Sequence, residues 1–250
     1  MANTHPVSQI KALTFDVFGT VVDWRKSIAQ EIKSVGIAKG FILDWNGFAD
    51  EWRAGYGPSM NKVRTGEMGW ANIDTLHRMI LDSLLETYNI SSLSESETQC
   101  LNKAWHRLDP WPDSVEGLTY LKKNYIISSL SNGNVALLVN MAKYGGLPWD
   151  TVLSAELVRH YKPDRETYLS TSEFFGLPIE KVMMVAAHKN DLKSARSTGM
   201  RTAYVPRPYE HGLDVEVDRE PEEYIDIIAD DFVDLSKKLT EARETGFIPE

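Results

Sequence analysis

The sequence predicts an α/β fold, with an open, Rossmann-like parallel sheet as its core and a helical cap domain inserted after the first strand. Three short apolar runs that stop at polar residues support the sheet: residues 11–15 (KALTF), 125–130 (YIISSL) and 181–187 (KVMMVAA). Continuous apolar runs of this length are typical of parallel strands buried on both faces. A change to helical spacing after Asp23 supports the cap.

Two weaker runs extend the predicted sheet, and helical segments separate its strands. The weaker runs are residues 201–205 (RTAYV) and 224–229 (YIDIIA), and amphipathic segments cover residues 115–123, 135–144 and 165–175. Strands that alternate with helices along a chain are typical of an open α/β sheet.

The inserted segment is predicted to be all-helical. Its clearest helix covers residues 70–88, in which apolar residues recur at helical spacing: Ile73, Leu76, Ile80 and Leu84. Prolines at positions 110 and 112 mark the return to the sheet. We therefore expect a cap domain of residues 24–109 over the carboxyl end of the first strand, and a core domain of residues 1–23 and 110–250.

The charge balance excludes several classes of partner. The chain has 36 acidic and 27 basic residues, a formal net charge of -9 and a pI of about 5.2. This balance argues against binding a nucleic acid or an anionic membrane surface by bulk electrostatics.

No stretch approaches the roughly 20 apolar residues of a membrane helix, and the first residues do not resemble a signal peptide. With Cys100 as the single cysteine, we expect a cytoplasmic protein without an internal disulfide.

Polar residues at the ends of the apolar runs are the candidates for chemistry, because ligands of an open α/β sheet bind at the carboxyl ends of its strands. They are Asp16, Ser131 with Asn132, and Asp191. Asp16 lies in FDVFGT, where Gly19 permits a tight turn and Thr20 brings a hydroxyl near the carboxylate. A strand-end aspartate alone is also a common helix cap or turn residue, so other motifs must decide.

Four ordered motifs give the decision. FDVFGT is followed by SLSNGN, HYKPDRETY and VAAHKNDLK. In order and spacing they resemble the haloacid dehalogenase (HAD) superfamily, whose motifs are an Asp followed by x-x-G-T, a Ser or Thr ending a strand, a Lys, and an acidic strand end. The resemblance covers nearly all of the chain and implies a HAD-like core.

One position indicates the branch of the superfamily. Its phosphatases carry D-x-D, in which the second aspartate protonates the leaving oxygen and helps to bind magnesium, whereas this chain has Phe18 there. Phenylalanine can neither donate a proton nor bind a hard cation, and a halide leaving group needs no proton. The chain is therefore similar to the L-2-haloacid dehalogenases, which implies a metal-independent reaction without a cofactor.

By this resemblance, Asp16 attacks C2 of a short 2-haloalkanoic acid or a haloacetate and displaces the halide. Water then hydrolyses the aspartyl ester, which yields a 2-hydroxy acid. The matching residues are Arg53, Ser131, Asn132, Lys162, Tyr168 and Asp191. The resemblance also implies a homodimer. Each of these residues alone also fits an ordinary surface or packing position.

The substrate-binding roles follow from charge. Arg53 and Asn132 are candidates to stabilise the leaving halide, since a guanidinium and an amide N–H stabilise negative charge in a dry pocket. Ser131 and the backbone N–H groups of Val17 and Phe18 are candidates to bind the substrate carboxylate, because they donate without adding a charge.

The nucleophile has its own set of supporting residues. Lys162 is expected to keep Asp16 ionised, and Asp191 to orient Lys162 and polarise the hydrolytic water. Thr20 and Tyr168 are expected to support this arrangement.

The fourth motif departs from the family pattern. Many of these dehalogenases have Ser and Asn where this chain has Ala186 and His188. His188 is a candidate to replace them by a hydrogen bond to water or to Asp16, with a role that changes as it titrates near neutral pH. The alternative is that it only begins a helix.

The predicted cap is rich in aromatic residues: Trp45, Phe48, Trp52, Tyr56 and Trp70. If several face the active site, they narrow the pocket toward two-carbon acids such as chloroacetate or fluoroacetate; if not, they form the core of the cap.

Two other functions stay open at this point. A phosphatase of the same superfamily would use Asp16, Ser131 and Lys162 on a small phosphate ester, but it must explain Phe18. A non-enzymatic protein that binds a partner through its cap is supported only by the departures at Ala186 and His188.

Overall fold

A computed structural model describes residues 6–212 and 215–246. Within these residues the main sheet has six parallel strands in the order β5-β4-β1-β6-β7-β8. They are β1 (Ala12–Phe15), β4 (Ile126–Ser131), β5 (Thr151–Ser154), β6 (Val182–Ala186), β7 (Arg201–Tyr204) and β8 (Ile227–Ile228). The predicted open parallel sheet is confirmed. Its edge strand β5, which begins and ends with hydroxyl residues, has no continuous apolar run and was missed.

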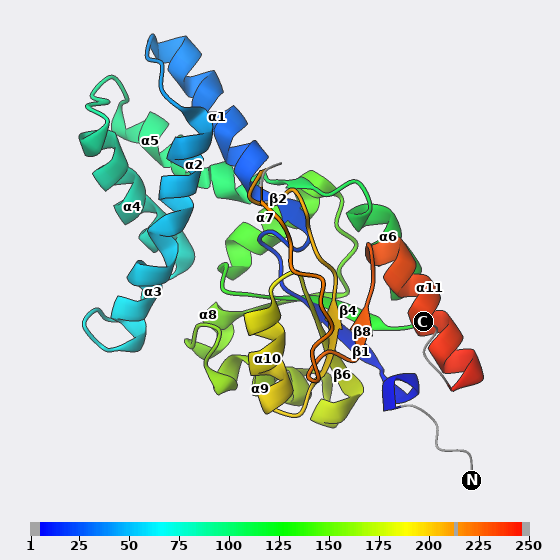
Figure 1. Ribbon diagram of the computed structural model, residues 1–250. Coiled ribbons are helices and arrows are strands. Elements are labelled where there is room, and N and C mark those ends of the chain that lie inside the picture. Colours follow the sequence, from blue (N-terminus) through cyan, green and yellow to red (C-terminus); the bar gives the residue numbers. More distant parts are fainter. Residues whose placement is uncertain (1–5, 213–214, 247–250) are drawn as a thin grey trace.

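Helices cover both faces of the sheet (Figure 1). On one side lie α6 (Ser114–Lys122) and α11 (Phe232–Thr245), and on the other α9 (Arg165–Phe175) and α10 (Lys189–Ser197). Successive residues of β1 point to opposite faces, so Leu13 and Phe15 pack in one apolar cluster and Ala12 in the other. Burial on both faces explains why the strands are apolar without alternation.

In the described part of the chain, four further elements complete the core. They are α7 (Val135–Gly145), α8 (Ala155–Val158) and the 3₁₀ turns η1 (Pro6–Gln9) and η3 (Ile179–Lys181). No helix in the described ranges combines the length and the apolar composition that a membrane crossing requires.

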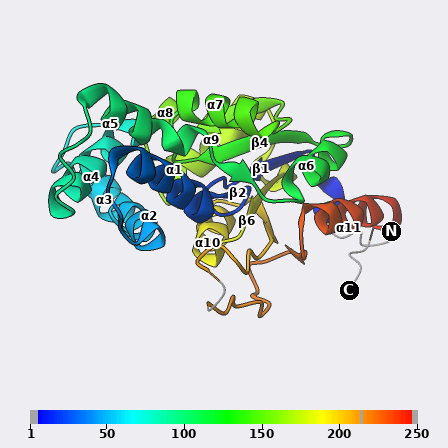
Figure 2. The ribbon, with the colours of Figure 1, turned by 90° about the horizontal axis from the view of Figure 1, so that it is seen from above.

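The inserted segment is helical, as predicted. It contains α1 (Trp24–Lys39), α2 (Trp45–Ala54), α3 (Tyr56–Arg64), α4 (Ile73–Thr87), α5 (Glu95–Asn102) and the 3₁₀ turn η2 (Lys103–His106), together called the helical cap below. Seen from above, the helical cap extends to one side of the sheet, with α1 beside β2 (Figure 2). The helix predicted for residues 70–88 begins only at Ile73, because the side chain of Asn72 caps it by accepting the N–H of Thr75.

A two-stranded ladder connects the helical cap to the sheet. Strand β2 (Val22–Asp23) pairs antiparallel with β3 (Asp109–Pro110). The hydroxyl of Ser27 accepts the Asp109 N–H at 2.9 Å and donates to the Asp23 carbonyl at 2.6 Å. The two segments that connect the cap to the core are therefore held side by side by these hydrogen bonds.

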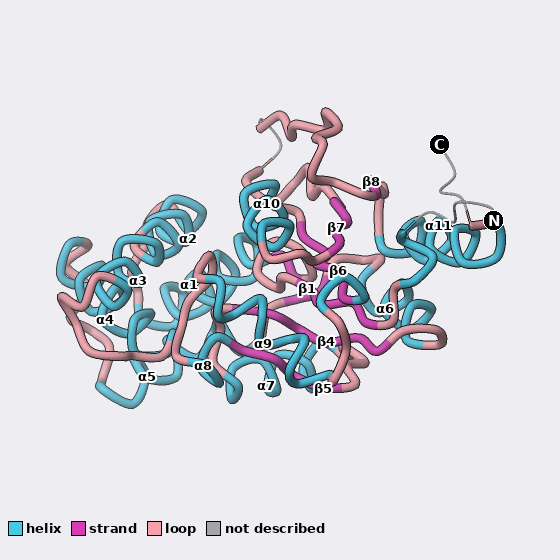
Figure 3. Tube along the Cα trace, turned by 90° about the horizontal axis from the view of Figure 1, so that it is seen from below, coloured by secondary structure: helices cyan, strands magenta, loops and turns pink. Residues whose placement is uncertain are grey.

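The central strands bring three loops to one edge of the sheet. Strand β1 lies between β4 and β6, with β5 beyond β4 and β7 beyond β6 (Figure 3). The backbone N–H of Asp16 extends this pairing by donating to the Val185 carbonyl at 3.0 Å. Residues that follow β1, β4 and β6 therefore meet at the carboxyl end of the sheet, beside the helical cap.

Candidate active site

A cavity of about 480 Å³ lies between the strand ends and the helical cap. The core lines it with Asp16, Phe18, Asn132, Lys162, Pro163, Tyr168, His188, Asn190, Asp191 and Ser194, and the cap with Arg53, Tyr56, Gly57, Met60, Asn61 and Arg64. The structure thus brings together most of the predicted site residues, from both domains, around one space.

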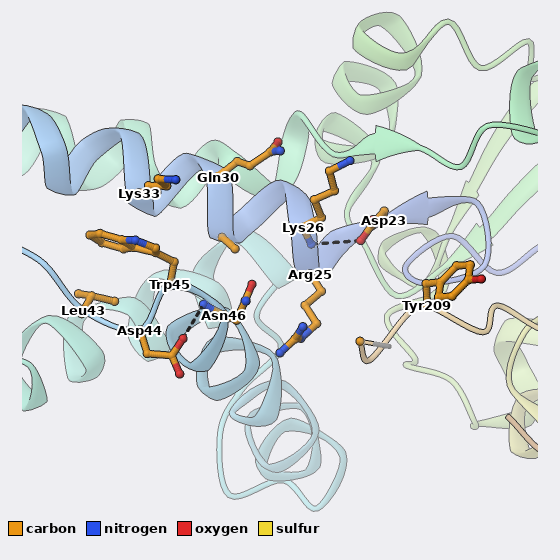
Figure 4. Close-up of a pocket in the computed structure, with 12 residues that line it drawn as sticks. Asp23, Arg25, Lys26, Gln30, Lys33, Leu43, Asp44, Trp45, Asn46 and Tyr209 are labelled. Carbon is orange, nitrogen blue, oxygen red and sulfur yellow. Dashed lines mark hydrogen bonds between the residues drawn. The ribbon is translucent and has the colours of Figure 1, made fainter. Parts of the chain in front are cut away.

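A second cavity of about 490 Å³ lies between α1, α2 and the loop of Tyr209 (Figure 4). Its carboxylates Asp23 and Asp44 cap helices, accepting backbone N–H groups at 3.1 Å each. None of the predicted site residues lines this cavity. The chemistry of the strand ends therefore belongs to the first cavity.

The turn after β1 holds Asp16 in a buried position. Gly19, with φ of 84°, reverses the chain, and the Thr20 hydroxyl returns to donate to Asp16 Oδ2 at 2.9 Å. The same hydroxyl accepts the N–H of Ala187 at 2.9 Å. Thr20 thus joins the loops after β1 and β6, and the Asp16 residue is only 8% exposed.

Lys162 is the cation on the other oxygen of Asp16. Its Nζ lies 2.8 Å from Asp16 Oδ1 and 2.6 Å from Asp191 Oδ2. The Tyr168 hydroxyl donates to Asp191 Oδ1 at 2.6 Å. Burial opposes ionisation of Asp16, but the charges and hydrogen bonds of its cationic neighbours outweigh burial and hold the Asp16 pKa well below its usual range.

His188 lies between two carboxylates. Its Nδ1 is 3.0 Å from Asp16 Oδ2, and its Nε2 is 2.9 Å from Glu210 Oε2. Burial favours the neutral ring, but hydrogen bonds to both carboxylates prevail and raise the pKa of His188 to about 10. The expectation that it titrates near neutral pH is therefore wrong. His188 is the N-cap residue of α10, yet its side chain makes no helix-capping hydrogen bond.

Glu210 was missed by the sequence reasoning. It lies in the loop after β7, is 5% exposed, and accepts the indole N–H of Trp24 at 3.0 Å through Oε1. The rule that sites form beyond strand ends would have pointed to this loop, but no motif in it distinguishes Glu210 from neighbouring polar residues.

On the cap side, Arg53 lies among aromatic rings. Its guanidinium carbon is 4.3 Å from the centre of the Tyr56 ring and 5.8 Å from that of Phe18. Its Nη1 is buried and has no hydrogen-bond partner in residues 6–212 and 215–246. A buried guanidinium with a free donor is suited to receiving an anion.

His77 is a second cap residue that the sequence did not indicate. Its ring is fully buried, stacks on Trp105 with centroids 4.2 Å apart, and has no partner for either nitrogen within the described ranges. Burial, aided by the nearby charge of Arg53, lowers its pKa to about 3. His77 is therefore neutral at pH 7.

Asn132 and Ser131 lie at different depths. Asn132 is in the cavity wall, where its Oδ1 accepts the Lys162 N–H at 2.7 Å and its Nδ2 contacts Met60 Sδ at 3.4 Å. Ser131 is 0% exposed, and its hydroxyl accepts the N–H of Gly133 at 3.1 Å. Neither Ser131 nor Val17 lines the cavity.

The aromatic residues of the cap do not narrow the pocket as a group. Tyr56 lines the cavity, whereas Phe48 and Trp52 are fully buried inside the helical cap. Trp70 stacks on Tyr161, with centroids 4.8 Å apart. Helical spacing showed that these residues face inward, but it could not show which neighbour they face.

Comparison with known proteins gives a consistent group of relatives. A family model described as haloacid dehalogenase-like hydrolase matches residues 10–199. The structure of a defluorinating L-2-haloacid dehalogenase is 44% identical with a TM-score of 0.89, over 92% of this chain and 95% of that one. A second L-2-haloacid dehalogenase structure is 42% identical with a TM-score of 0.89, over 92% and 99%. The (S)-2-haloacid dehalogenase 4A of Burkholderia cepacia is 27% identical over 80% of this chain and 85% of its own length.

Proposed function

The chain belongs to the haloacid dehalogenase-like hydrolases, and we propose that it is an (S)-2-haloacid dehalogenase. In this proposal it hydrolyses the carbon–halogen bond of short 2-haloalkanoic acids or haloacetates to 2-hydroxy acids. The observation that carries the proposal is that two features face one cavity. The core side has the buried Asp16–Lys162 ion pair, and the cap side has the Nη1 of Arg53, which lacks a hydrogen-bond partner in the described residues. The likeness to a defluorinating enzyme extends the proposed substrates to fluoroacetate.

In the first step, an oxygen of Asp16 attacks C2 and the carbon–halogen bond breaks. The bonding pair leaves with the halogen, so negative charge moves from the core side of the cavity to the leaving atom. Arg53 supports this step, because its free donor lies in a dry aromatic setting where a new anion is stabilised strongly. Lys162 keeps the nucleophile ionised until attack.

Phe18 favours this chemistry over the phosphatase alternative. A phosphate ester needs an acid for its leaving oxygen, and position 18 offers only a ring that packs 5.8 Å from Arg53. A halide leaves without a proton. The alternative of a non-enzymatic binding protein leaves the buried charges of the cavity without a purpose.

In the second step, water adds to Cγ of Asp16 and the ester bond breaks. The 2-hydroxy acid leaves, the carboxylate is restored, and one proton passes to solvent. Asp191 supports this step, because its carboxylate fixes the Lys162 ammonium beside the ester. We place the substrate carboxylate near Asn132 and the backbone N–H groups of Val17 and Phe18, with Ser131 beneath them.

We also propose that the molecule has two domains. Residues 24–109 act as a cap domain on a core of residues 1–23 and 110–250, and the β2–β3 ladder at the junction supports this division. The enzyme works as a cytoplasmic homodimer without a metal or a cofactor. Light scattering at micromolar concentration tests the dimer.

Halide release tests the function. We expect chelator-resistant release from L-2-chloropropanoate or the haloacetates, little from the D enantiomer, and a loss of at least about 10³-fold in Asp16→Asn, which removes the nucleophile. Magnesium-dependent hydrolysis of an aryl phosphate without halide release would instead support the phosphatase. Turnover in H₂¹⁸O under single-turnover conditions should place the label in Asp16.

A further inference from the structure

Two ion pairs flank Asp16, one on each carboxylate oxygen. Lys162 with Asp191 lies on Oδ1, and His188 with Glu210 lies on Oδ2. The two oxygens are not equivalent, because Oδ2 also accepts the Thr20 hydroxyl at 2.9 Å, while among the described residues Oδ1 has only Lys162 as a side-chain donor. Oδ1, with one side-chain donor, is therefore the oxygen that is more free to react, whereas Oδ2 is held by the two donors Thr20 and His188.

The place of Glu210 is built into the surrounding fold. Arg207, in the same loop, donates from Nε to the Thr20 carbonyl at 2.8 Å and pairs with Asp113 at 2.7 Å. Gly19 lies against the Glu210 carboxylate so closely that a Cβ at position 19 would overlap it. The loop is thus anchored to the turn that carries the nucleophile, and this turn leaves room for a carboxylate.

We propose that His188 is a catalytic residue of ester hydrolysis, acting as a charged hydrogen-bond donor to Asp16 Oδ2, and that Glu210 is the positioning residue that keeps it there and charged. This inference rests on the proposed dehalogenase function. It assigns Oδ1 as the attacking atom and Oδ2 as the carbonyl oxygen of the aspartyl ester.

The chemistry of the second step explains the need for such a donor. When water adds to Cγ, the electron pair of the carbonyl bond moves onto Oδ2 and forms an oxyanion. The N–H of His188 and the hydroxyl of Thr20 stabilise that charge from the positions they already occupy. The oxyanion then collapses, the Cγ–Oδ1 bond breaks, and the product oxygen takes one proton of the water while the other passes to solvent.

The groups around His188 favour its charged form. Asp16 and Glu210 contact its two nitrogens, and Lys162 lies on the far oxygen of Asp16. His211, whose Nε2 is 3.8 Å from Glu210, the carboxylate of Asp23 and the hydroxyl of Tyr204 are further ionisable groups that interact with Glu210. The pKa of about 10 agrees with a ring that donates through both nitrogens at neutral pH and cannot act there as a base.

Separating the two chemical steps tests the inference. For His188→Ala, which leaves no side-chain donor at this position, we expect a burst of about one halide per site, followed by slow turnover, and an aspartyl ester visible in the intact-protein mass. Loss of one oxyanion donor predicts hydrolysis slower by about 10²-fold. In Glu210→Gln the His188 pKa should fall, so hydrolysis should slow as pH rises from 6 to 9, whereas the wild-type rate stays flat. His211→Asn, on the same loop, is the matched control and should change neither step.

The outcomes separate this inference from the function on which it rests. Wild-type protein without halide release overturns the function itself. Wild-type halide release with no ester in His188→Ala, or with both steps slowed equally, overturns only the role of His188. A flat pH profile in Glu210→Gln overturns the role of Glu210. If His188→Ala does not fold, His188→Leu provides the same comparison.

Discussion

The two sides of the active-site cavity each have a histidine, one partly buried and one fully buried, and the two have opposite charge states. On the core wall, His188 contacts two carboxylates and its pKa rises to about 10. Behind the cap wall, His77 has no partner in the described residues, and burial near Arg53 lowers its pKa to about 3. The comparison shows that an imidazole withdrawn from solvent is charged where carboxylates contact it and neutral where it has only burial and a nearby cation.

The walls also differ in how their donors are used. On the core wall Lys162 and His188 are both paired with carboxylates before any substrate binds. On the cap wall the Nη1 of Arg53 has no hydrogen-bond partner among the residues that the structure describes. Since dehalogenation moves negative charge from a core carboxylate to a leaving atom, this difference provides a place for the charge that the reaction creates.

Among the substitutions that test this comparison, removal of the free donor of the cap should change halide release the most. For Arg53→Met we expect halide release to fall by about 10²- to 10³-fold, because the leaving halide loses its charged donor. Arg64→Met is the matched control, since Arg64 lines the same cavity but is already paired with Asp164 at 2.7 Å. Steady-state halide release of both variants measures the difference, and equal losses would show that net charge in the cavity is what matters.

The pH dependence of stability should separate the two histidines. His188 binds a proton more tightly when folded, so its contribution is complete below pH 6.5 and is lost as pH rises toward 10. His77 binds a proton more weakly when folded, so stability falls as pH falls from 6.5 toward 3. His188→Asn should therefore flatten the alkaline side of the profile, and His77→Phe the acid side.

Urea unfolding from pH 4 to pH 10 measures these slopes. Asp16, whose pKa is lowered, adds its own loss of stability below about pH 4, so the acid comparison is made between pH 5 and 6.5. An unchanged acid slope in His77→Phe would mean that a bound water or ion keeps the ring of His77 charged.

The smallest expected effect concerns the contact between the walls. Arg64 and Asp164 join α3 to the loop before α9, with side chains 35% and 22% exposed. An ion pair this exposed contributes at most about 1 kcal/mol and weakens with salt. Arg64→Met should lower the free energy of unfolding by no more than that amount, and the difference from wild type should shrink in 1 M salt; a larger or salt-independent loss would indicate a packing role.

The sequence revealed the charged centre of the site better than its surroundings. Asp16, Lys162 and Asp191 were predictable, because strand ends and ordered motifs mark them. Glu210 was not, since its partner Trp24 is 186 residues away and no motif links them. His77 resembled any inward residue of a helix, and its lack of partners exists only once α4 packs against Trp105. The strands were found by composition, whereas β5, short and at the sheet edge, lacked that signal.

The place of β1 in the middle of the sheet has a consequence for the order of events during synthesis. This strand leaves the ribosome first, but its partners β4 and β6 begin only at Ile126 and Val182. The helices between them contact mainly one another, so they are able to fold while β1 still waits for both neighbours. Until both of these strands have been made, β1 therefore lacks at least one of its neighbours in the sheet, and Asp16 gains its second cation only when residue 188 has been made.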